Sequence, residues 1–257
     1  MENLLTTDSL ISLITLTSLE IVLGIDNVIF VSIIMGKLQT DRQRLTARRT
    51  WMILGIIVRV LLLLGLTGLV ANGSNELFGF NWKEKHYAFN LRNVIMFAGG
   101  IFLLYKTVTE IHEKLEGDEH VSNAHAKKAA LGAVLVQIVL VDMIFSFDSI
   151  ITAVGLANHV EIMIIAVVIA MIIMFFFSQK ISAFINKHPT LKMLALAFLL
   201  MVGFSLFFEG LEPLHGSHIE KGYIYFAMAF SFGVELLNMR IRKKRSKRVE
   251  VKKGSKV

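Results

Sequence analysis

Long apolar runs recur along this chain, and they restrict its fold more than any other feature. A run of roughly 18 or more apolar residues is long enough for an α-helix to cross the hydrocarbon core of a bilayer. Over its 257 residues the chain is 54% hydrophobic and contains only two prolines. Because backbone polar groups inside a bilayer need internal hydrogen bonds, which a helix provides, we expect an all-α polytopic membrane protein.

We predict seven transmembrane helices joined by short connections. Their expected ranges are 9–36, 50–71, 91–110, 130–157, 161–178, 192–210 and 222–239. Residues 1–239 then form a single transmembrane domain, and residues 240–257 form a basic tail. No basic residue precedes the first apolar run, so we expect this run to be a retained span and not a cleaved signal peptide.

Basic residues concentrate in alternate connections. Segment 37–49 contains five Lys or Arg residues, loops 111–129 and 179–192 contain three each, and ten of the 27 lie between Arg240 and Lys256. The positive-inside rule therefore places the N-terminus outside and the C-terminus in the cytoplasm. The net charge of +7 comes largely from the tail, which we interpret as an anchor near anionic lipid and not as a nucleic-acid site. With no cysteine, the chain has no disulfide and no thiolate metal ligand.

Two of the predicted spans carry the same acidic pattern. In each, a carboxylate is followed by a small residue four positions later, a second carboxylate at six and a short polar residue at seven. The residues are Glu20, Gly24, Asp26 and Asn27 in the first span, and Asp142, Ser146, Asp148 and Ser149 in the fourth. A carboxylate at the centre of a membrane helix costs roughly 2.5–3.5 kcal/mol, so such residues usually serve a function.

The two acidic spans are expected to run in opposite directions through the membrane. This arrangement indicates an inverted repeat, in which spans 1–3 (about 9–110) are related to spans 4–6 (about 130–210) by an axis in the membrane plane. The third spans of the two halves agree weakly, since Gly100 precedes Lys106 by six residues as Gly203 precedes Glu209. The seventh span, 222–239, then lies outside the repeat.

Helical geometry limits how each acidic pattern can bind an ion. On a straight helix Glu20, Gly24 and Asn27 share one face, whereas Asp26 lies about 120° away from Glu20. We therefore expect either a break in the helix near Gly24 or a site that is shared between the two repeats.

The candidate ligands are all oxygen donors, which suit Mg²⁺, Ca²⁺ and Mn²⁺. We expect the methionines to be packing or lipid-facing residues. Closely spaced carboxylates can alternatively carry protons, because each raises the pKa of the other. Arg59, in the second span, is a possible charge partner for one of these acids, although one Arg cannot neutralise four carboxylates. We expect Lys106 and Glu110 to extend to the membrane interface.

The two acidic patterns and the stretches 110–113, 221–227 and 234–238 resemble the TerC (tellurite-resistance C) family, and the chain is most similar to its small bacterial inner-membrane members. The resemblance implies a manganese exporter of the wider LysE-like transporter group, located in the inner membrane. It implies that the ion site consists of Glu20, Asp26, Asn27, Asp142, Asp148 and Ser149.

Our leading hypothesis is a divalent-cation transporter, most specifically for Mn²⁺ efflux, that works by alternating access around a midplane carboxylate site. The alternatives are a membrane scaffold or metal-resistance protein without transport activity, and a proton-coupled calcium transporter. An intramembrane aspartyl protease is disfavoured because Ile25 and Phe147, and not Gly, precede the aspartates. A retinal protein is disfavoured because 222–239 contains no Lys. We expect no enzymatic activity and no resident cofactor, and we expect the metal cation and the lipid bilayer as partners.

Overall fold

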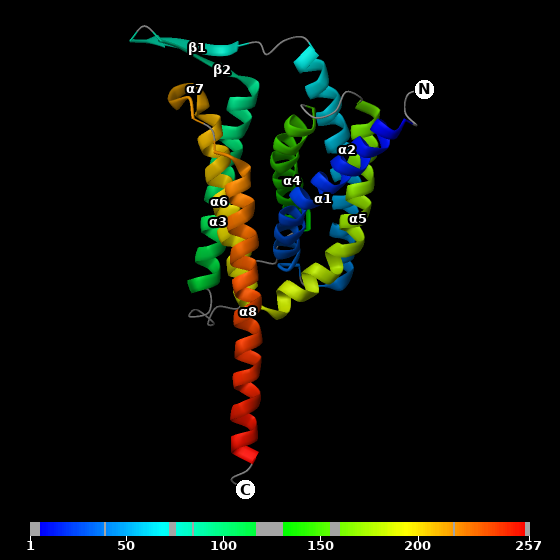
Figure 1. The fold of residues 1–257 in the computed structure, drawn as a ribbon, viewed down its shortest axis with the longest axis vertical. Coiled ribbons are helices and arrows are strands. Elements are labelled where there is room, and N and C mark those ends of the chain that lie inside the picture. The colour runs from blue at the N-terminus through cyan, green and yellow to red at the C-terminus, as the bar shows by residue number, and fades with distance from the viewer. Residues whose placement is uncertain are drawn as a thin grey trace.

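The computed structural model describes residues 6–38, 40–71, 76–83, 85–116, 131–154, 160–217 and 219–254. Within the helices, the side chains of some residues, Asp26 and Asp148 among them, lie outside this description. The described part is mostly helical, with one small sheet (Figure 1). Its elements are α1 (Thr7–Met35), α2 (Asp41–Ala71), β1 (Glu76–Trp82), β2 (Lys85–Asn90), α3 (Leu91–Glu116), α4 (Leu131–Val154), α5 (Val160–Lys187), α6 (Pro189–Gly210), α7 (Glu212–His215) and α8 (Lys221–Gly254).

Each of the seven predicted spans corresponds to one helix. Among the described residues, α3, α5, α6 and residues Lys221–Arg242 of α8 are long and apolar enough to cross a membrane, and α1 becomes a fifth candidate if its bent halves form one span. In α4 the described apolar stretch, Leu131–Phe147, is shorter. The protein is therefore a multi-pass helical membrane protein, and the count of seven spans remains a prediction.

Helix pairing divides the molecule into two groups. The most extensive contacts join α1 to α5, α2 to α4, and α3 to α6. In Figure 1, α1, α2, α4 and α5 lie on one side, and α3, α6 and α8 lie on the other. The apolar cores of α1, α4 and α5 meet at fully buried residues such as Ile34, Ile138 and Met171.

The helices α3 and α6 touch through their backbones at three glycines. A Cβ on Gly100 would lie 2.6 Å from the Cα of Phe207, and a Cβ on Gly210 would lie 2.6 Å from the Cα of Phe97. One turn beyond the Gly100 contact, Gly203 lies against Leu103 and Leu104. Since real Cβ atoms do not approach this closely, only glycine permits this spacing at Gly100 and Gly210.

The connection between α2 and α3 contains an antiparallel hairpin that the sequence analysis did not predict. Its strands pair Phe78 with Phe89 and Phe80 with Tyr87, and these rings stack with centroids 4.9 Å and 5.2 Å apart. Such cross-strand aromatic pairs stabilise a short ladder. The expectation of an all-α fold is therefore corrected by this one hairpin. Figure 1 shows the hairpin extending from the end of the helices.

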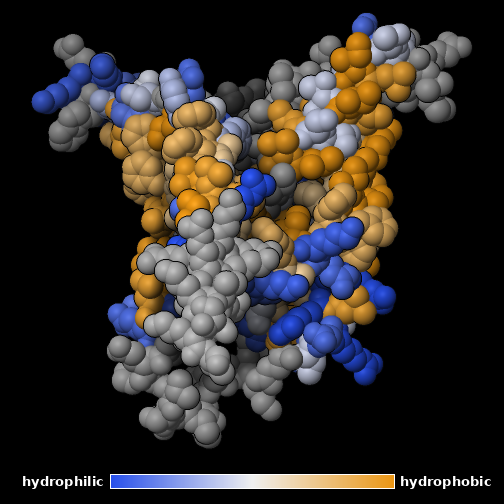
Figure 2. All heavy atoms as spheres, turned by 60° about the horizontal axis from the view of Figure 1, so that its bottom comes forward, coloured by the Kyte–Doolittle hydropathy of each residue, from blue (hydrophilic) through white to orange (hydrophobic). Residues whose placement is uncertain are grey.

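Four helices extend by six residues or more beyond the spans predicted for them (α2, α3, α5 and α8), and the changes at the second and the last span involve the basic segments. The second begins at Asp41 rather than at residue 50, so that the basic segment of the first connection forms its opening turns. The last continues to Gly254, so the basic tail begins as a helix. Figure 2 shows hydrophobic side chains along the flanks and hydrophilic ones gathered toward the end where α2 begins, consistent with a water-facing end.

Candidate functional site

A cluster of three buried charges lies where α1, α2 and α4 meet. Arg59 donates from Nη1 to Oε2 of Glu20 at 2.9 Å and from Nη2 to Oδ1 of Asp142 at 3.1 Å. Its Nε lies 3.5 Å from the other oxygen of Asp142. All three side chains are at least 98% buried. We call Glu20, Arg59 and Asp142 the buried charge cluster; it joins one acid from each of the two matched patterns.

A small residue makes room for this cluster on α2. Gly55 lies one turn before Arg59, and a Cβ there would lie 3.3 Å from Oδ2 of Asp142 and 2.7 Å from Cε of Met171. The absent side chain lets the Asp142 carboxylate lie against the helix and present both oxygens to the guanidinium. This fork-to-carboxylate geometry is the strongest form of Arg pairing, because two hydrogen bonds form in parallel.

The polar residues that follow Asp142 on α4 face the same region. The hydroxyl of Ser146 donates to the backbone oxygen of Asp142, and that of Ser149 donates to the backbone oxygen of Ser146 at 3.2 Å. Ser149 also lies beside the Glu20 carboxylate. The structure therefore brings together Glu20, Arg59, Asp142 and Ser149.

Three buried side-chain oxygens on α1 have no hydrogen-bond partner among the described residues, and one of them is Oγ1 of Thr17. The other two belong to the first acidic pattern. They are Oε1 of Glu20 and Oδ1 of Asn27, on side chains that are 2% and 3% exposed. An unpaired buried acceptor is costly, so its presence in a native structure points to a ligand or an unplaced partner. Both are the kind of oxygen that a hard or borderline cation binds.

The remaining site predictions are Asp26 and Asp148, whose side chains lie outside the described residues. Each follows its partner acid by six positions, and the helical backbone is present at both. Among the described residues, no three His, Cys, Asp or Glu side chains form a group that could hold a metal. Arg59 instead occupies the space between the two described acids.

The first acidic helix is bent next to the cluster. Segments Thr7–Val22 and Asn27–Met35 of α1 meet at about 40°, and Gly24 lies in the stretch between them. The helix is therefore bent near Gly24, and one acid from each of the two patterns also meets the same guanidinium. How an ion would bind there stays a prediction.

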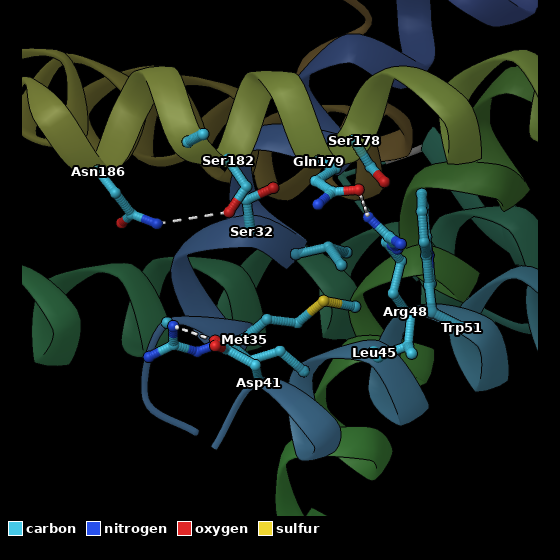
Figure 3. Close-up of a pocket in the computed structure, with 14 residues that line it drawn as sticks. Ser32, Met35, Asp41, Leu45, Arg48, Trp51, Ser178, Gln179, Ser182 and Asn186 are labelled. Carbon is cyan, nitrogen blue, oxygen red and sulfur yellow. Dashed lines mark hydrogen bonds and ion pairs between the residues drawn. The ribbon is translucent and has the colours of Figure 1, made fainter. Parts of the chain in front are cut away.

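A polar pocket of about 440 Å³ opens between the ends of α1, α2 and α5 (Figure 3). Two of its arginines are paired, Arg48 with Gln179 at 3.0 Å and Arg44 with Asp41 at 3.3 Å. This pocket could not be identified from the sequence, because its residues come from three separate helices. We call it the basic-end pocket; its lining includes Val31, Ser32, Met35, Asp41, Arg44, Arg48, Trp51, Ser178, Gln179, Ser182 and Asn186.

An ion-pair cluster at the same end joins the two helix groups. Lys37, just after α1, donates to Glu110 at 2.6 Å and to Glu113 at 2.8 Å on α3. Lys106 lies 3.5 Å from Glu110, which is 4% exposed, so this acid is buried against two cations and does not extend freely to the interface. Burial by itself lowers the pKa of Lys37, but the hydrogen bonds to the two carboxylates outweigh it and raise that pKa above 10.5.

Comparison with known proteins agrees with the assignment of the chain as a membrane protein. The family model described as "Integral membrane protein TerC family" matches residues 5–250. The chain is 44% identical to a "UPF0053 protein" of Haemophilus influenzae, over 91% of this chain and 94% of that protein. It is 47% identical to the "UPF0053 inner membrane protein YgdQ" of Escherichia coli K12, over 90% of this chain and 92% of that protein.

A third relative is larger. The "UPF0053 inner membrane protein YoaE" of Escherichia coli K12 is 44% identical over 90% of this chain, but the match covers only 43% of that protein. No solved structure matches the chain. The similarity therefore identifies a family of membrane proteins, and the chemistry must be argued from the site itself.

Proposed function

Because the chain belongs to the TerC family of integral membrane proteins, we propose that it transports a divalent metal cation, most specifically Mn²⁺ out of the cytoplasm. The observation that carries this proposal is the buried charge cluster, in which two carboxylates share one guanidinium. This leaves a net negative charge inside the membrane before Asp26 and Asp148 are counted. A divalent cation is the partner that such an excess of oxygen ligands favours.

In this proposal Arg59 takes the place of the transported ion when the site is empty. The guanidinium satisfies Glu20 and Asp142 and so avoids the cost of two unpaired buried acids. An entering cation binds the carboxylates and releases Arg59. Asp26 and Asp148 are the proposed core ligands, with Asn27 and Ser149 as further oxygen donors.

The proposed mechanism is alternating access by an inverted repeat of three plus three helices, with α8 as the additional seventh span. The helix pairing supports it: if α1, α2 and α3 correspond to α4, α5 and α6, then the α1–α5 contact is equivalent to the α4–α2 contact. Exchanging the two halves then maps the α3–α6 contact onto itself. Within it, the contact of Gly100 with Phe207 corresponds to the contact of Gly203 with Leu104. A site at the repeat interface is the usual location in such transporters.

We further propose that the chain lies in the inner membrane, as the names of its Escherichia coli relatives state for those proteins. The basic residues of 37–49 and of the tail favour a cytoplasmic location for the basic-end pocket and the C-terminus.

The test is cation uptake by purified protein in liposomes, measured separately for Mn²⁺, Ca²⁺ and Mg²⁺ at several pH values. We expect Mn²⁺ uptake by the parent and at least a tenfold lower rate for Glu20→Gln, Asp142→Asn, Asp26→Asn and Asp148→Asn. Glu212→Gln is the matched control, since Glu212 pairs with Arg92 away from the cluster. A parent protein that binds Mn²⁺ without moving it would instead favour the scaffold hypothesis.

A further inference from the structure

Three helix faces run continuously from the buried charge cluster to the basic-end pocket. On α1 the face of Glu20, Gly24 and Asn27 continues, at spacings of three and four, to Val31 and Met35 in the pocket wall. On α2 the face of Arg59 and Gly55 continues to Trp51 and Arg48. Because α1 and α2 each contribute residues to both, the pocket lies along these two helices from the cluster.

The third face, on α5, places two methionines between the pocket and the cluster. Ser178 and Ser182 line the pocket, and Met174 and Met171 follow at spacings of four and three toward the cluster. They are 3% and 0% exposed. A Cβ on Gly55 would lie 2.7 Å from Cε of Met171 and 3.3 Å from Oδ2 of Asp142. The Met171 side chain therefore lies beside a cluster carboxylate.

Met174 packs against Gly24 of α1, between Glu20 and Asn27 in the sequence, each of which carries an unpaired oxygen. Its sulfur occupies the space that a Cβ on Gly24 would need, and Gly24 lies between Glu20 and Asn27 on their shared face. Those two residues are about 10 Å apart along an ideal helix, so one ion cannot bind both oxygens at once. The sulfur therefore packs against α1 at a residue that lies between the two oxygen-bearing residues in the sequence.

We propose that Met174, with Met171 beside it, ligates the transported cation between the basic-end pocket and the buried carboxylates, and that these thioethers select d-block divalent cations over Ca²⁺ and Mg²⁺. The inference rests on the proposed transport function and specifies its substrate class. Ca²⁺ and Mg²⁺ take oxygen ligands, and Mg²⁺ gives up water reluctantly. A passage with a thioether in place of an oxygen disfavours both ions most strongly relative to the soft Cd²⁺, and less strongly relative to Mn²⁺, which is softer than Ca²⁺ but also takes oxygen ligands.

Substitution by leucine tests the role of the sulfur, because leucine has nearly the volume of methionine and has no sulfur atom. In liposomes containing the purified full chain, uptake of Mn²⁺, Cd²⁺, Ca²⁺ and Mg²⁺ is measured for the parent, Met174→Leu and Met171→Leu. Met163→Leu is the control, since Met163 is an equally buried methionine of α5 in a different apolar cluster. A Met174→Gln variant places an amide oxygen near the position of the sulfur.

We expect both Leu variants to reduce Cd²⁺ and Mn²⁺ uptake about tenfold at low ion concentration, with no effect of Met163→Leu. Met174→Gln is expected to make Ca²⁺ a stronger competitor of Mn²⁺ uptake. An unchanged ratio of Mn²⁺ to Ca²⁺ uptake in variants that elute as the parent does on size exclusion overturns the inference alone. A parent that moves none of the four ions overturns the proposed function as well.

Discussion

At the scale of single residues, Arg59 is the charge partner of one acid from each of the two acidic patterns. One guanidinium holds an acid from each pattern, so Oε2 of Glu20 and the Asp142 carboxylate are not free to bind a cation until Arg59 moves. The pairing also explains how two carboxylates remain in the apolar interior, since a buried charge is tolerated only when it is paired.

Replacing Arg59 should therefore affect stability and metal binding in opposite directions. Arg59→Gln leaves two buried carboxylates without their cation, which costs about 3–5 kcal/mol. We expect a lower Tm in detergent, and a rise in Tm on addition of Mn²⁺ that is larger than in the parent, because the metal replaces the lost charge. Arg49→Gln, at an exposed position of the same helix, is the control. An equal Mn²⁺ effect in both variants would argue against displacement of Arg59 by the ion.

Part of the site could be predicted from the sequence, and the physical reason is local spacing. Glu20 and Asp142 were identifiable because costly carboxylates recurred at matched positions, and Arg59 because it was a cation within a predicted span. Gly55, Met171 and Met174 could not be identified, since their importance arises where α2 and α5 cross other helices. A methionine has no signature that separates packing from ligation until its neighbours are known.

At the scale of elements, the glycines of α3 and α6 make the clearest prediction. Gly100→Ala places a Cβ against the backbone of Phe207, which cannot move as a flexible side chain can. We expect a loss of about 1–3 kcal/mol in the free energy of unfolding, or failure to fold.

The control for this prediction is Gly132→Ala in α4, where a Cβ meets nothing within 4 Å. There alanine should be neutral or stabilising by up to about 1 kcal/mol, because it favours the helix. Thermal unfolding in detergent measures both changes. Equal stability of Gly100→Ala and the parent would show that the two helices separate easily.

The elements themselves were largely predictable, apart from their ends and the hairpin. Apolar runs located every long helix, because membrane burial makes hydrophobicity the dominant signal. The same signal does not mark where a helix continues into water, as α2 does from Asp41 and α8 does to Gly254. The hairpin was missed because its aromatic alternation, Phe78 and Phe80 against Tyr87 and Phe89, lies in a connection expected to be a loop.

At the scale of the whole molecule, the Lys37 contacts join the two helix groups at the basic end. The raised pKa of Lys37 means that their stabilisation is complete below about pH 10.5 and is lost as the pH rises through the folded-state pKa. The side chain of Lys37 is 31% exposed, so we expect Lys37→Met to cost only about 1 kcal/mol or less.

The difference in Tm between parent and Lys37→Met should therefore stay constant from about pH 6 to 9 and shrink only above the ordinary lysine pKa. Lys180→Met, on the exposed face of α5, controls for the loss of one positive charge. A difference that disappears by pH 8 would mean that Lys37 does not hold its charge through these contacts.

The orientation can be tested directly, because the chain contains no cysteine to remove. Single substitutions Asn81→Cys in the hairpin and Asn186→Cys near the end of α5 place one thiol at each end of the molecule. We expect a membrane-impermeant thiol reagent to label Asn81→Cys in intact cells and Asn186→Cys only after permeabilisation. The reverse pattern would invert the proposed direction of every span.

The backbone contacts between α3 and α6 have a mechanical consequence. Packed helices usually shift past one another through small changes in an intervening layer of side chains. At Gly100 and Gly210 no such layer separates the two helices. The two helices should therefore tilt together as one rigid unit. A displacement of Lys37, which contacts the basic end of α3, should then also move the opposite end of α6.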